Sequence, residues 1–178
     1  MAAVSRLARS CIPFFFAAAS VALVGCASGG RTYLFEGETK SAWKEVEPAL
    51  PAFPERANLI PLDLGSESTS LSFIDEKSLT LAEDGVVRFT LIVRAAGGAQ
   101  NVSFEGVRCE TAERKLYAIG RNDREWIRPR ASDWQRISDN GFNRQHALLA
   151  TDFFCPRGTI PPNRDEIVKS LRQAAGLR

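Results

Sequence analysis

Two cysteines and a histidine are the residues of this sequence with the most reactive side chains. Cys109 and Cys155 are accompanied by His146, the single histidine of the chain, and by Asp152. A cysteine beside an imidazole that a carboxylate orients is the pattern of a thiol nucleophile, because the imidazole can take the thiol proton. The sequence therefore offers a cysteine-dependent enzyme as one hypothesis.

The same residues also have a structural interpretation. His146 is spaced by four and three residues from Phe142 and Leu149, which favours a hydrogen-bonded histidine on the apolar face of a helix. Cys109 and Cys155 are the two cysteines that remain after the N-terminal segment described below, and an even pair in an oxidising compartment favours one disulfide. We therefore predict a Cys109–Cys155 disulfide, with a free nucleophilic thiol as the alternative.

Carboxylates are a second source of chemistry. Glu105, Glu110 and Glu113 lie close in the sequence, and paired carboxylates can do general acid–base work. Their spacing of five and three residues around a strand end gives them no common face, so we interpret them as a solvated edge. One histidine and two available cysteines are too few ligands to suggest zinc. We predict no catalytic site, no metal and no cofactor.

A run of aromatic and basic residues between positions 124 and 136 is the best candidate for a ligand surface. Indole rings can stack on sugars, and guanidinium groups can hold an anionic glycan or a lipid headgroup. The alternative is that the rings are packed and the arginines lie over them. The residues assigned to this candidate surface are Trp126, Arg128, Arg130, Trp134 and Arg136.

The first 25 residues carry the features of an export signal. Arg6 and Arg9 precede an apolar run of about 15 residues, which is too short to cross a bilayer comfortably. The run ends in Leu-Val-Gly-Cys at residues 23–26, which resembles the lipobox of bacterial lipoproteins. That resemblance implies acyl chains on Cys26, and two or three such chains hold a protein on a membrane.

Residue 27 and the charge balance limit the location and the partners. Ala27 stands where lipoproteins of the inner membrane usually carry Asp, so the resemblance implies the outer membrane, with the domain facing the periplasm. The chain has 23 Lys and Arg and 21 Asp and Glu, and the counts become equal once Arg6 and Arg9 leave with the signal. A neutral domain argues against nucleic acid as a partner, because phosphate binding depends on clustered cations.

The elements that position these residues start with extended chain and continue as strands. Four prolines between positions 48 and 61 restrain the backbone, and residues 66–70 are interpreted as a loop. Strict alternation over residues 86–95 predicts a strand with Phe89 on its apolar face and Arg88 on the opposite face. The meander is expected to begin around Leu79 and Leu81, and further strands are expected over 100–108 and 113–120 and at 126–127. We expect an antiparallel meander of about four or five strands.

The last third of the chain has helical periodicity. One helix is expected from Ser138 or Asp139 to Cys155, with Phe153 on its apolar face. A second follows Asn163, which can form a capping box with Glu166, and its apolar stripe comprises Ile167, Leu171 and Ala174. An antiparallel sheet with C-terminal helices packed on it is a single α+β domain.

Several blocks of the sequence together form a recognisable pattern. They are Trp43-x-Glu45, Leu50-Pro-Ala-Phe-Pro54, Leu59-Ile-Pro61, Phe73-Ile-Asp75-x-x-Ser78-Leu79, Asp84-Gly-Val-Val-Arg88-Phe-Thr-Leu91 and Asn101-Val-x-Phe-Glu105-Gly-Val-Arg-Cys109. These blocks resemble the cryptic neisserial protein (CNP)-like family of bacterial exported proteins. The resemblance covers about residues 35–175 and implies a short, exported, often lipidated protein without assigned catalytic chemistry.

Together these patterns predict three segments: a lipoprotein signal peptide at 1–25, a flexible tether at 26–37 and an α+β domain at 38–178. We expect a non-enzymatic, lipid-anchored envelope protein that serves as a periplasmic binding or structural module. Its expected partners are the membrane, through the N-terminal lipid, and an envelope protein or cell-wall glycan. Two alternatives are a glycan or anionic-lipid binding module that uses the surface around Trp126 and Trp134, and a cysteine-dependent enzyme.

Overall fold

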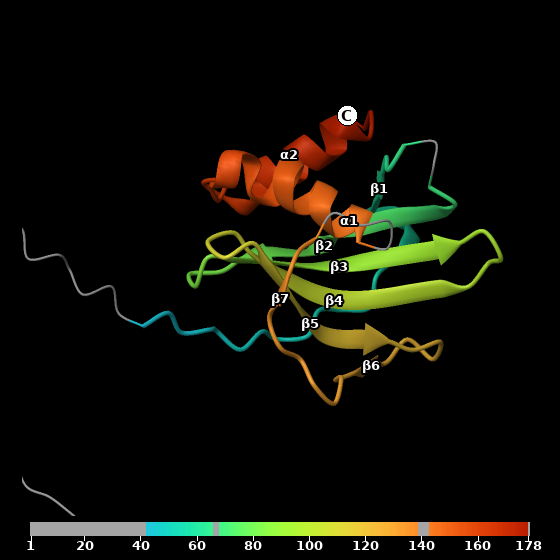
Figure 1. Cartoon of the computed structure of the whole chain (residues 1–178). Helices are drawn as coiled ribbons and strands as arrows, with labels where there is room; N and C mark the ends of the chain where they lie inside the picture. Colours follow the sequence, from blue (N-terminus) through green and yellow to red (C-terminus); the bar gives the residue numbers. More distant parts are fainter. Residues whose placement is uncertain (1–41, 66–67, 139–142, 178) are drawn as a thin grey trace, which may run out of the picture. The chain divides into compact units, whose positions relative to one another are not determined.

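One antiparallel sheet organises the part of the chain that a computed structural model describes, residues 42–65, 68–138 and 143–177 (Figure 1). The strands lie side by side in chain order from β1 to β6, and β7 pairs with β5. They are β1 (Leu59–Leu62), β2 (Ser70–Leu81), β3 (Val86–Ala95), β4 (Gln100–Arg108), β5 (Glu113–Gly120), β6 (Trp126–Ile127) and β7 (Gln135–Arg136). The expected signal peptide, tether and Cys26 lie outside the described residues.

The strands over 86–95, 100–108 and 113–120 are confirmed. The described sheet has seven strands rather than four or five, because β1, β7 and the first half of β2 were not expected. Pro61 is tolerated in β1 because this strand is at the edge of the sheet, where a missing amide donor costs no ladder hydrogen bond.

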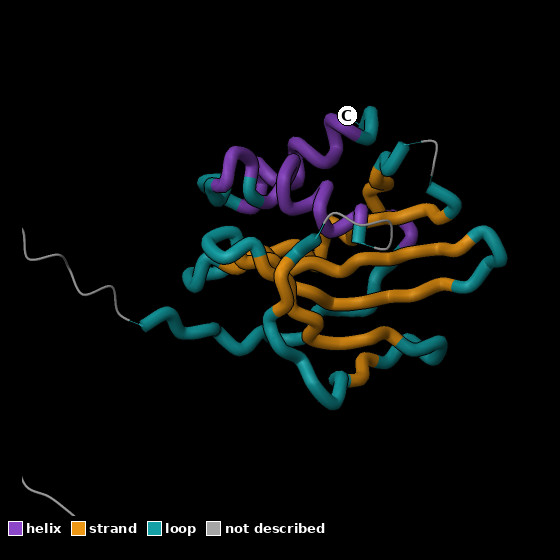
Figure 2. The backbone as a smooth tube through the Cα atoms, viewed as in Figure 1, coloured by secondary structure: helices purple, strands orange, loops and turns teal. Residues whose placement is uncertain are grey.

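The helical segments cover one face of the sheet, as Figure 2 shows in purple. They are α1 (Arg144–Leu148), the π-helix η2 (Leu149–Phe154), the short 3-10 turn η3 (Pro156–Gly158) and α2 (Arg164–Ala174). Another 3-10 turn, η1 (Arg56–Asn58), precedes β1. The main core lies between this layer and the sheet, and the rings of Phe89 and Phe154 pack there at 4.8 Å between centroids. None of the helices among the described residues is long and apolar enough to cross a bilayer.

The expected helical stripe is shifted at its C-terminal end. Phe154 is fully buried, whereas Phe153, which was expected to point inward, is only partly buried. The cause is the π-helix: the amide of Cys155 bonds to the carbonyl of Ala150 five residues back, so the wider turn advances the buried face by one residue. Phe142 lies outside the described residues.

The cap of α2 is confirmed, since the Asn163 side chain accepts a hydrogen bond from the Glu166 amide at 3.0 Å. The apolar stripe of this helix differs from the expectation at two positions. Ile167 and Leu171 are buried, but Val168 joins them and Ala174 is exposed.

The opposite face of the sheet is covered by extended chain, residues 42–54, which we call the strap (blue-green in Figure 1). A small cluster of Phe104, Tyr117 and Ala118 lies on this side. The strap approaches β5 closely at Gly120: a Cβ atom there would lie 2.7 Å from the Phe53 ring, so any larger residue would displace the strap.

Coverage of both faces changes the surroundings expected for Arg88. This residue was expected on the face opposite the apolar one, and its exposed fraction on that face is 2%. The alternation of β3 was read correctly, since Phe89 faces the helices and Arg88 the other side. What the pattern did not show is that the strap buries this second side.

Candidate functional site

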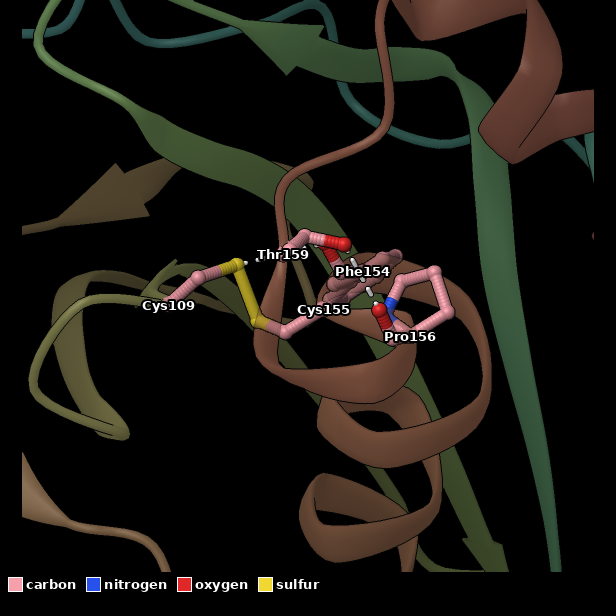
Figure 3. Close-up of a disulfide and its surroundings, with 5 residues drawn as sticks. All are labelled: Cys109, Phe154, Cys155, Pro156 and Thr159. Carbon is pink, nitrogen blue, oxygen red and sulfur yellow. Dashed lines mark hydrogen bonds between the residues drawn. A yellow bond between two sulfur atoms is a disulfide. The ribbon is translucent and has the colours of Figure 1, made fainter.

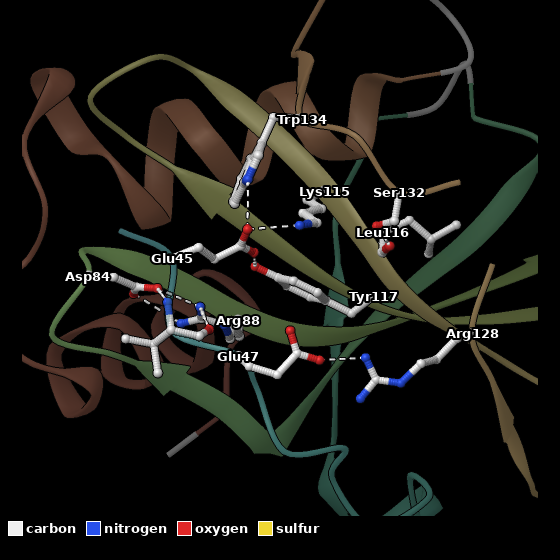
Figure 4. A network of polar contacts seen from close by, with 11 residues as sticks. Glu45, Glu47, Asp84, Arg88, Lys115, Leu116, Tyr117, Arg128, Ser132 and Trp134 are labelled. Atoms are coloured by element: carbon white, nitrogen blue, oxygen red, sulfur yellow. Dashed lines mark hydrogen bonds and ion pairs between the residues drawn. The ribbon is translucent and has the colours of Figure 1, made fainter. Parts of the chain in front are cut away.

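The strap is attached to the sheet mainly through side chains, and Glu45 makes the first attachment (Figure 4). Its carboxylate accepts hydrogen bonds from Lys115 Nζ at 2.8 Å, Tyr117 Oη at 2.8 Å and Trp134 Nε1 at 3.2 Å. Burial disfavours the charged carboxylate, but these donors outweigh burial and hold the pKa of Glu45 below its ordinary value. The strap is thus tied to β5 by an ionised carboxylate.

Asp84, in the turn between β2 and β3, makes the second attachment. Its carboxylate pairs with the Arg88 guanidinium at 2.6 Å and accepts a hydrogen bond from the Val46 amide at 2.8 Å. Arg88 Nη2 also donates to the Val46 carbonyl at 2.6 Å, and Trp43 Nε1 donates to the Asp84 carbonyl at 2.9 Å. Although burial opposes ionisation, these contacts hold the pKa of Asp84 below its ordinary value.

The two tryptophans of the predicted ligand surface make further contacts with the strap. Trp126 Nε1 donates to the Pro51 carbonyl at 2.9 Å and its ring packs on Phe53, while Trp134 packs edge-on against Trp43. Both rings are half-buried. The three basic residues assigned to the same surface are exposed: Arg128, which pairs with Glu47, and Arg130 and Arg136.

The chain between the two tryptophans is held along β5 by Ser132, whose hydroxyl donates to the Leu116 carbonyl (Figure 4). The segment that was predicted as a ligand surface thus meets the strap, with the indole rings turned toward the protein and the arginines at the surface.

A cleft separates the strap from β2. Its volume is about 430 Å³, and a second cavity of about 180 Å³ adjoins it, with Pro51, Ala52, Lys77 and Ser78 in the walls of both. The strap supplies an apolar wall of alanine, leucine and proline residues, and Arg88 and Phe104 contribute from the sheet. Small-molecule sites are typically concave and mostly apolar with a few placed polar groups, so this cleft is the candidate binding site.

An irregularity in β2 shapes the smaller cavity. The pairing of β2 with β3 shifts register between Asp75 and Thr80, so extra residues bulge there. Ser78 stabilises the bulge, because its hydroxyl donates to the Asp75 carbonyl at 2.9 Å and accepts from the Thr90 amide at 2.8 Å.

Asp75 is the most unusual polar residue of the candidate site. Its exposed fraction is 2%, and its carboxylate accepts a long hydrogen bond of 3.4 Å from the Lys77 amide. Burial, which hydrogen bonds offset only in part, raises the pKa of this carboxyl above its ordinary value. No cationic side chain of the described residues lies within 4.0 Å of it. Asp75 was not identified from the sequence as a site residue, because the half of β2 that contains it was not predicted as a strand.

Glu105 and His146 form a separate buried pair on the helical side of the sheet. His146 Nε2 lies 2.7 Å from Glu105 Oε2, and Ser103 donates to the same carboxylate at 2.5 Å. Burial opposes ionisation, but these contacts and Arg114 at 3.8 Å lower the pKa of Glu105. The interpretation of Glu105 as a solvated edge was wrong, because α1 packs over this end of β4 and β5. His146 is the packed, hydrogen-bonded residue that was expected.

The predicted disulfide between Cys109 and Cys155 is confirmed (Figure 3). It joins the residue after β4 to the residue after η2, across a sequence separation of 46 residues. Neither sulfur is therefore a free thiol in this structure. Asp152 is exposed and accepts from the Thr151 hydroxyl, so the carboxylate that contacts His146 is Glu105.

Comparisons with known proteins place the chain among relatives without an assigned activity. The family described as the CNP1-like family matches residues 38–172. The curated protein named Cryptic neisserial protein 1, from Neisseria gonorrhoeae, is 28% identical over 116 residues, which is 58% of this chain and 56% of that protein. This chain thus spans little more than half of that relative. No solved structure matches.

Proposed function

We propose that this chain, which belongs to the CNP1-like family, is a non-enzymatic, lipid-anchored protein of the cell envelope whose domain is a binding module. The observation that carries the binding role is the cleft between the strap and β2, whose volume of about 430 Å³ is in the range of small-ligand sites. The ligand or partner would come from the periplasm.

Two observations support the envelope location. The chain has Leu-Val-Gly-Cys at residues 23–26 after a short apolar run, as lipid-anchored bacterial proteins do. The domain has a disulfide, which persists in oxidising compartments such as the periplasm. Acylation of Cys26 would hold the domain on the outer membrane.

The anchor is tested by replacing the lipidated residue. The full chain with Cys26→Ala should leave the outer-membrane fraction and should not incorporate labelled palmitate, because the acylated sulfur is gone. Cys11→Ala is the matched control and should change neither measurement. A Cys26→Ala protein that stays in the membrane fraction would refute the lipid anchor.

A non-enzymatic role is supported by how the candidate catalytic groups are used. The two sulfurs form the disulfide, and the imidazole of His146 is buried against Glu105. Protein isolated without reductant should therefore show no thiol that a maleimide alkylates, as read by mass spectrometry of unreduced peptides. A rapidly alkylated Cys109 or Cys155 would favour the cysteine-dependent enzyme.

The binding role is tested by filling the cleft. Ala52 is exposed and lies in the walls of both cavities, so Ala52→Trp should block them without disturbing the core. Ala57→Trp is the matched control, because Ala57 is an exposed residue that lines neither cavity. Sedimentation with purified cell-wall fragments should fall for the first variant only.

A glycan or anionic-lipid module using the surface of Trp126 and Trp134 is the second candidate. The exposed guanidinium groups of Arg128, Arg130 and Arg136 favour it, since they can meet an anionic group from solvent. In that case, Arg130→Ala with Arg136→Ala should reduce sedimentation with cell-wall fragments or anionic vesicles, and Ala52→Trp should not.

A further inference from the structure

We propose that the cavity at Asp75 binds a small ligand through a cationic nitrogen, such as an ammonium group, with the apolar body of the ligand in the adjoining cleft. This inference rests on the proposed binding function, because it names the ligand class of the same site. Three observations carry it: the burial of Asp75, the charges around it and the continuity of the two cavities.

The first observation is a buried carboxyl group to which the fold gives no cationic partner among the described residues. Asp75 is 2% exposed, and it accepts hydrogen bonds from uncharged groups, the Lys77 amide at 3.4 Å and Ser78. An asparagine would make the same contacts without carrying a charge. A buried carboxylate whose charge is not compensated by the fold fits a residue kept for a ligand rather than for stability.

The second observation is that Glu55, a charged residue in the cavity wall, acts on Asp75 with the same sign. Glu55 lines the same cavity and its negative charge contributes to the raised pKa of Asp75, whereas Lys77 meets Asp75 through its backbone. A ligand that brings a positive charge would relieve both carboxylates. The Phe53 ring, also in the lining, adds a surface on which a cation is favourable.

The third observation, the continuity of the two cavities, indicates the chemistry of the rest of the ligand. The small cavity and the larger cleft are continuous, because Pro51 and Ala52 line both. A molecule anchored at Asp75 can therefore extend past these residues into the cleft. Ala49, Leu50 and Phe104 give the larger cleft apolar walls, beside Arg88, whose charge is paired with Asp84. The ligand class is therefore a cationic amphiphile of modest size.

The test compares probes that differ in charge alone. Hexylammonium, 1-hexanol and hexanoate would be titrated into the full chain, with binding measured by calorimetry and by backbone amide shifts of residues 75–78 in NMR spectra. Hexylammonium should bind most tightly and should shift those amides. Equal affinity for 1-hexanol, or tighter binding of hexanoate, would overturn the cationic preference.

Variants with opposite expected effects sharpen the test. Asp75→Asn should weaken hexylammonium binding by about tenfold or more, as expected for loss of a charge-assisted hydrogen bond. Glu55→Gln should weaken it less, and Lys77→Gln should strengthen it, because that change removes a competing cation from the walls. Asp165→Asn, at an exposed acid on α2, is the control. Unchanged binding by Asp75→Asn would overturn the proposal.

Ala52→Trp separates this inference from the broader function. It leaves Asp75 intact and should abolish hexylammonium binding by occlusion; retained binding would place the probe elsewhere and overturn the site. If hexylammonium fails to bind while Ala52→Trp still reduces sedimentation with cell-wall fragments, the ligand class is wrong and the binding cleft stands.

Discussion

Arg88 shows how a single residue couples the strap to the sheet. Its side chain and that of Asp84 are exposed by only 3% and 1%, and the pair is hydrogen-bonded to the backbone of Val46. Removing one member of a buried ion pair leaves the other charge buried and uncompensated. This lowers the free energy of unfolding by more than the intact pair contributes to it. The strap therefore depends on both members of the pair.

Replacing Arg88 with Met should lower the free energy of unfolding by about 3–5 kcal/mol, because Asp84 would be left buried and unpaired. This is the range expected for Phe89→Ala in the core. Urea unfolding monitored by circular dichroism measures both. Arg130→Met, at an exposed arginine, should change stability by no more than about 0.5 kcal/mol. A near-neutral Arg88→Met would show that the strap does not bury this face in solution.

Asp75 should affect stability in the opposite way to most buried acids. Its raised pKa means that the folded state favours the protonated form, so its contribution is fully present below the unfolded-state pKa of about 3.9 and is lost as pH rises through the folded-state pKa. Asp75→Asn should therefore be more stable than the parent at pH 7, with the difference shrinking toward pH 3. Urea unfolding across this pH range is the measurement. Lower stability of the variant at pH 7 would mean that the carboxylate serves the fold.

Among the elements, those with a clear period were predictable from the sequence and those without one were not. The alternation of β3 placed Phe89 correctly, and the cap at Asn163 placed the start of α2. The strap has no periodicity that a local pattern could reveal. It is held in place by side chains from β5 and from turns that are distant in the sequence. The burial of Arg88 and the surroundings of Asp75 depend on the strap, so the candidate site could not be derived from local pattern.

The π-helix is a second element that local pattern could not show. A helical stripe with 3.6 residues per turn predicts that Phe153 points into the core. Phe154 is buried there instead, because the amide of Cys155 bonds to the carbonyl of Ala150, five residues earlier. The disulfide was predictable because the prediction came from the number of cysteines and the expected export, rather than from local geometry.

Acid should loosen the strap as an element. The pKa values of Glu45 and Asp84 are lowered, so the stability they contribute is present above the unfolded-state pKa values of about 4.3 and 3.9 and is lost as pH falls through the folded-state values. Carboxyl carbon shifts in NMR spectra should give midpoints below those values. Lys115→Met should move the midpoint of Glu45 upward, and Lys169→Met, on α2, should leave it in place. A Glu45 midpoint at its ordinary value would contradict the attachment.

At the scale of the whole molecule, the sheet lies between two unlike layers. The helical layer is joined to it covalently at Cys109–Cys155, whereas the strap is joined through Glu45, Asp84 and the tryptophan contacts. The cleft between the strap and β2 lies on the side of the sheet that the strap covers.

Reduction of the disulfide should lower global stability by up to about 4 kcal/mol, because a loop with a sequence separation of 46 residues is freed in the unfolded chain. Cys109→Ser and Cys155→Ser should be destabilised to a similar extent, and the double variant should be no less stable than either. Thermal unfolding with and without reductant provides the measurement. A large difference between the two single variants would indicate a role for one sulfur beyond the bridge.

The uneven distribution of aromatic residues gives the protein a built-in optical probe. The chain has three tryptophans: Trp43 is part of the strap, Trp134 bonds to Glu45, and Trp126 bonds to Pro51. The core beneath the helices contains phenylalanines instead, Phe89 and Phe154. Indole emission therefore originates entirely on the strap side. In one unlabelled sample, a change in emission with constant far-ultraviolet ellipticity reports departure of the strap, and the reverse reports melting of the helical layer.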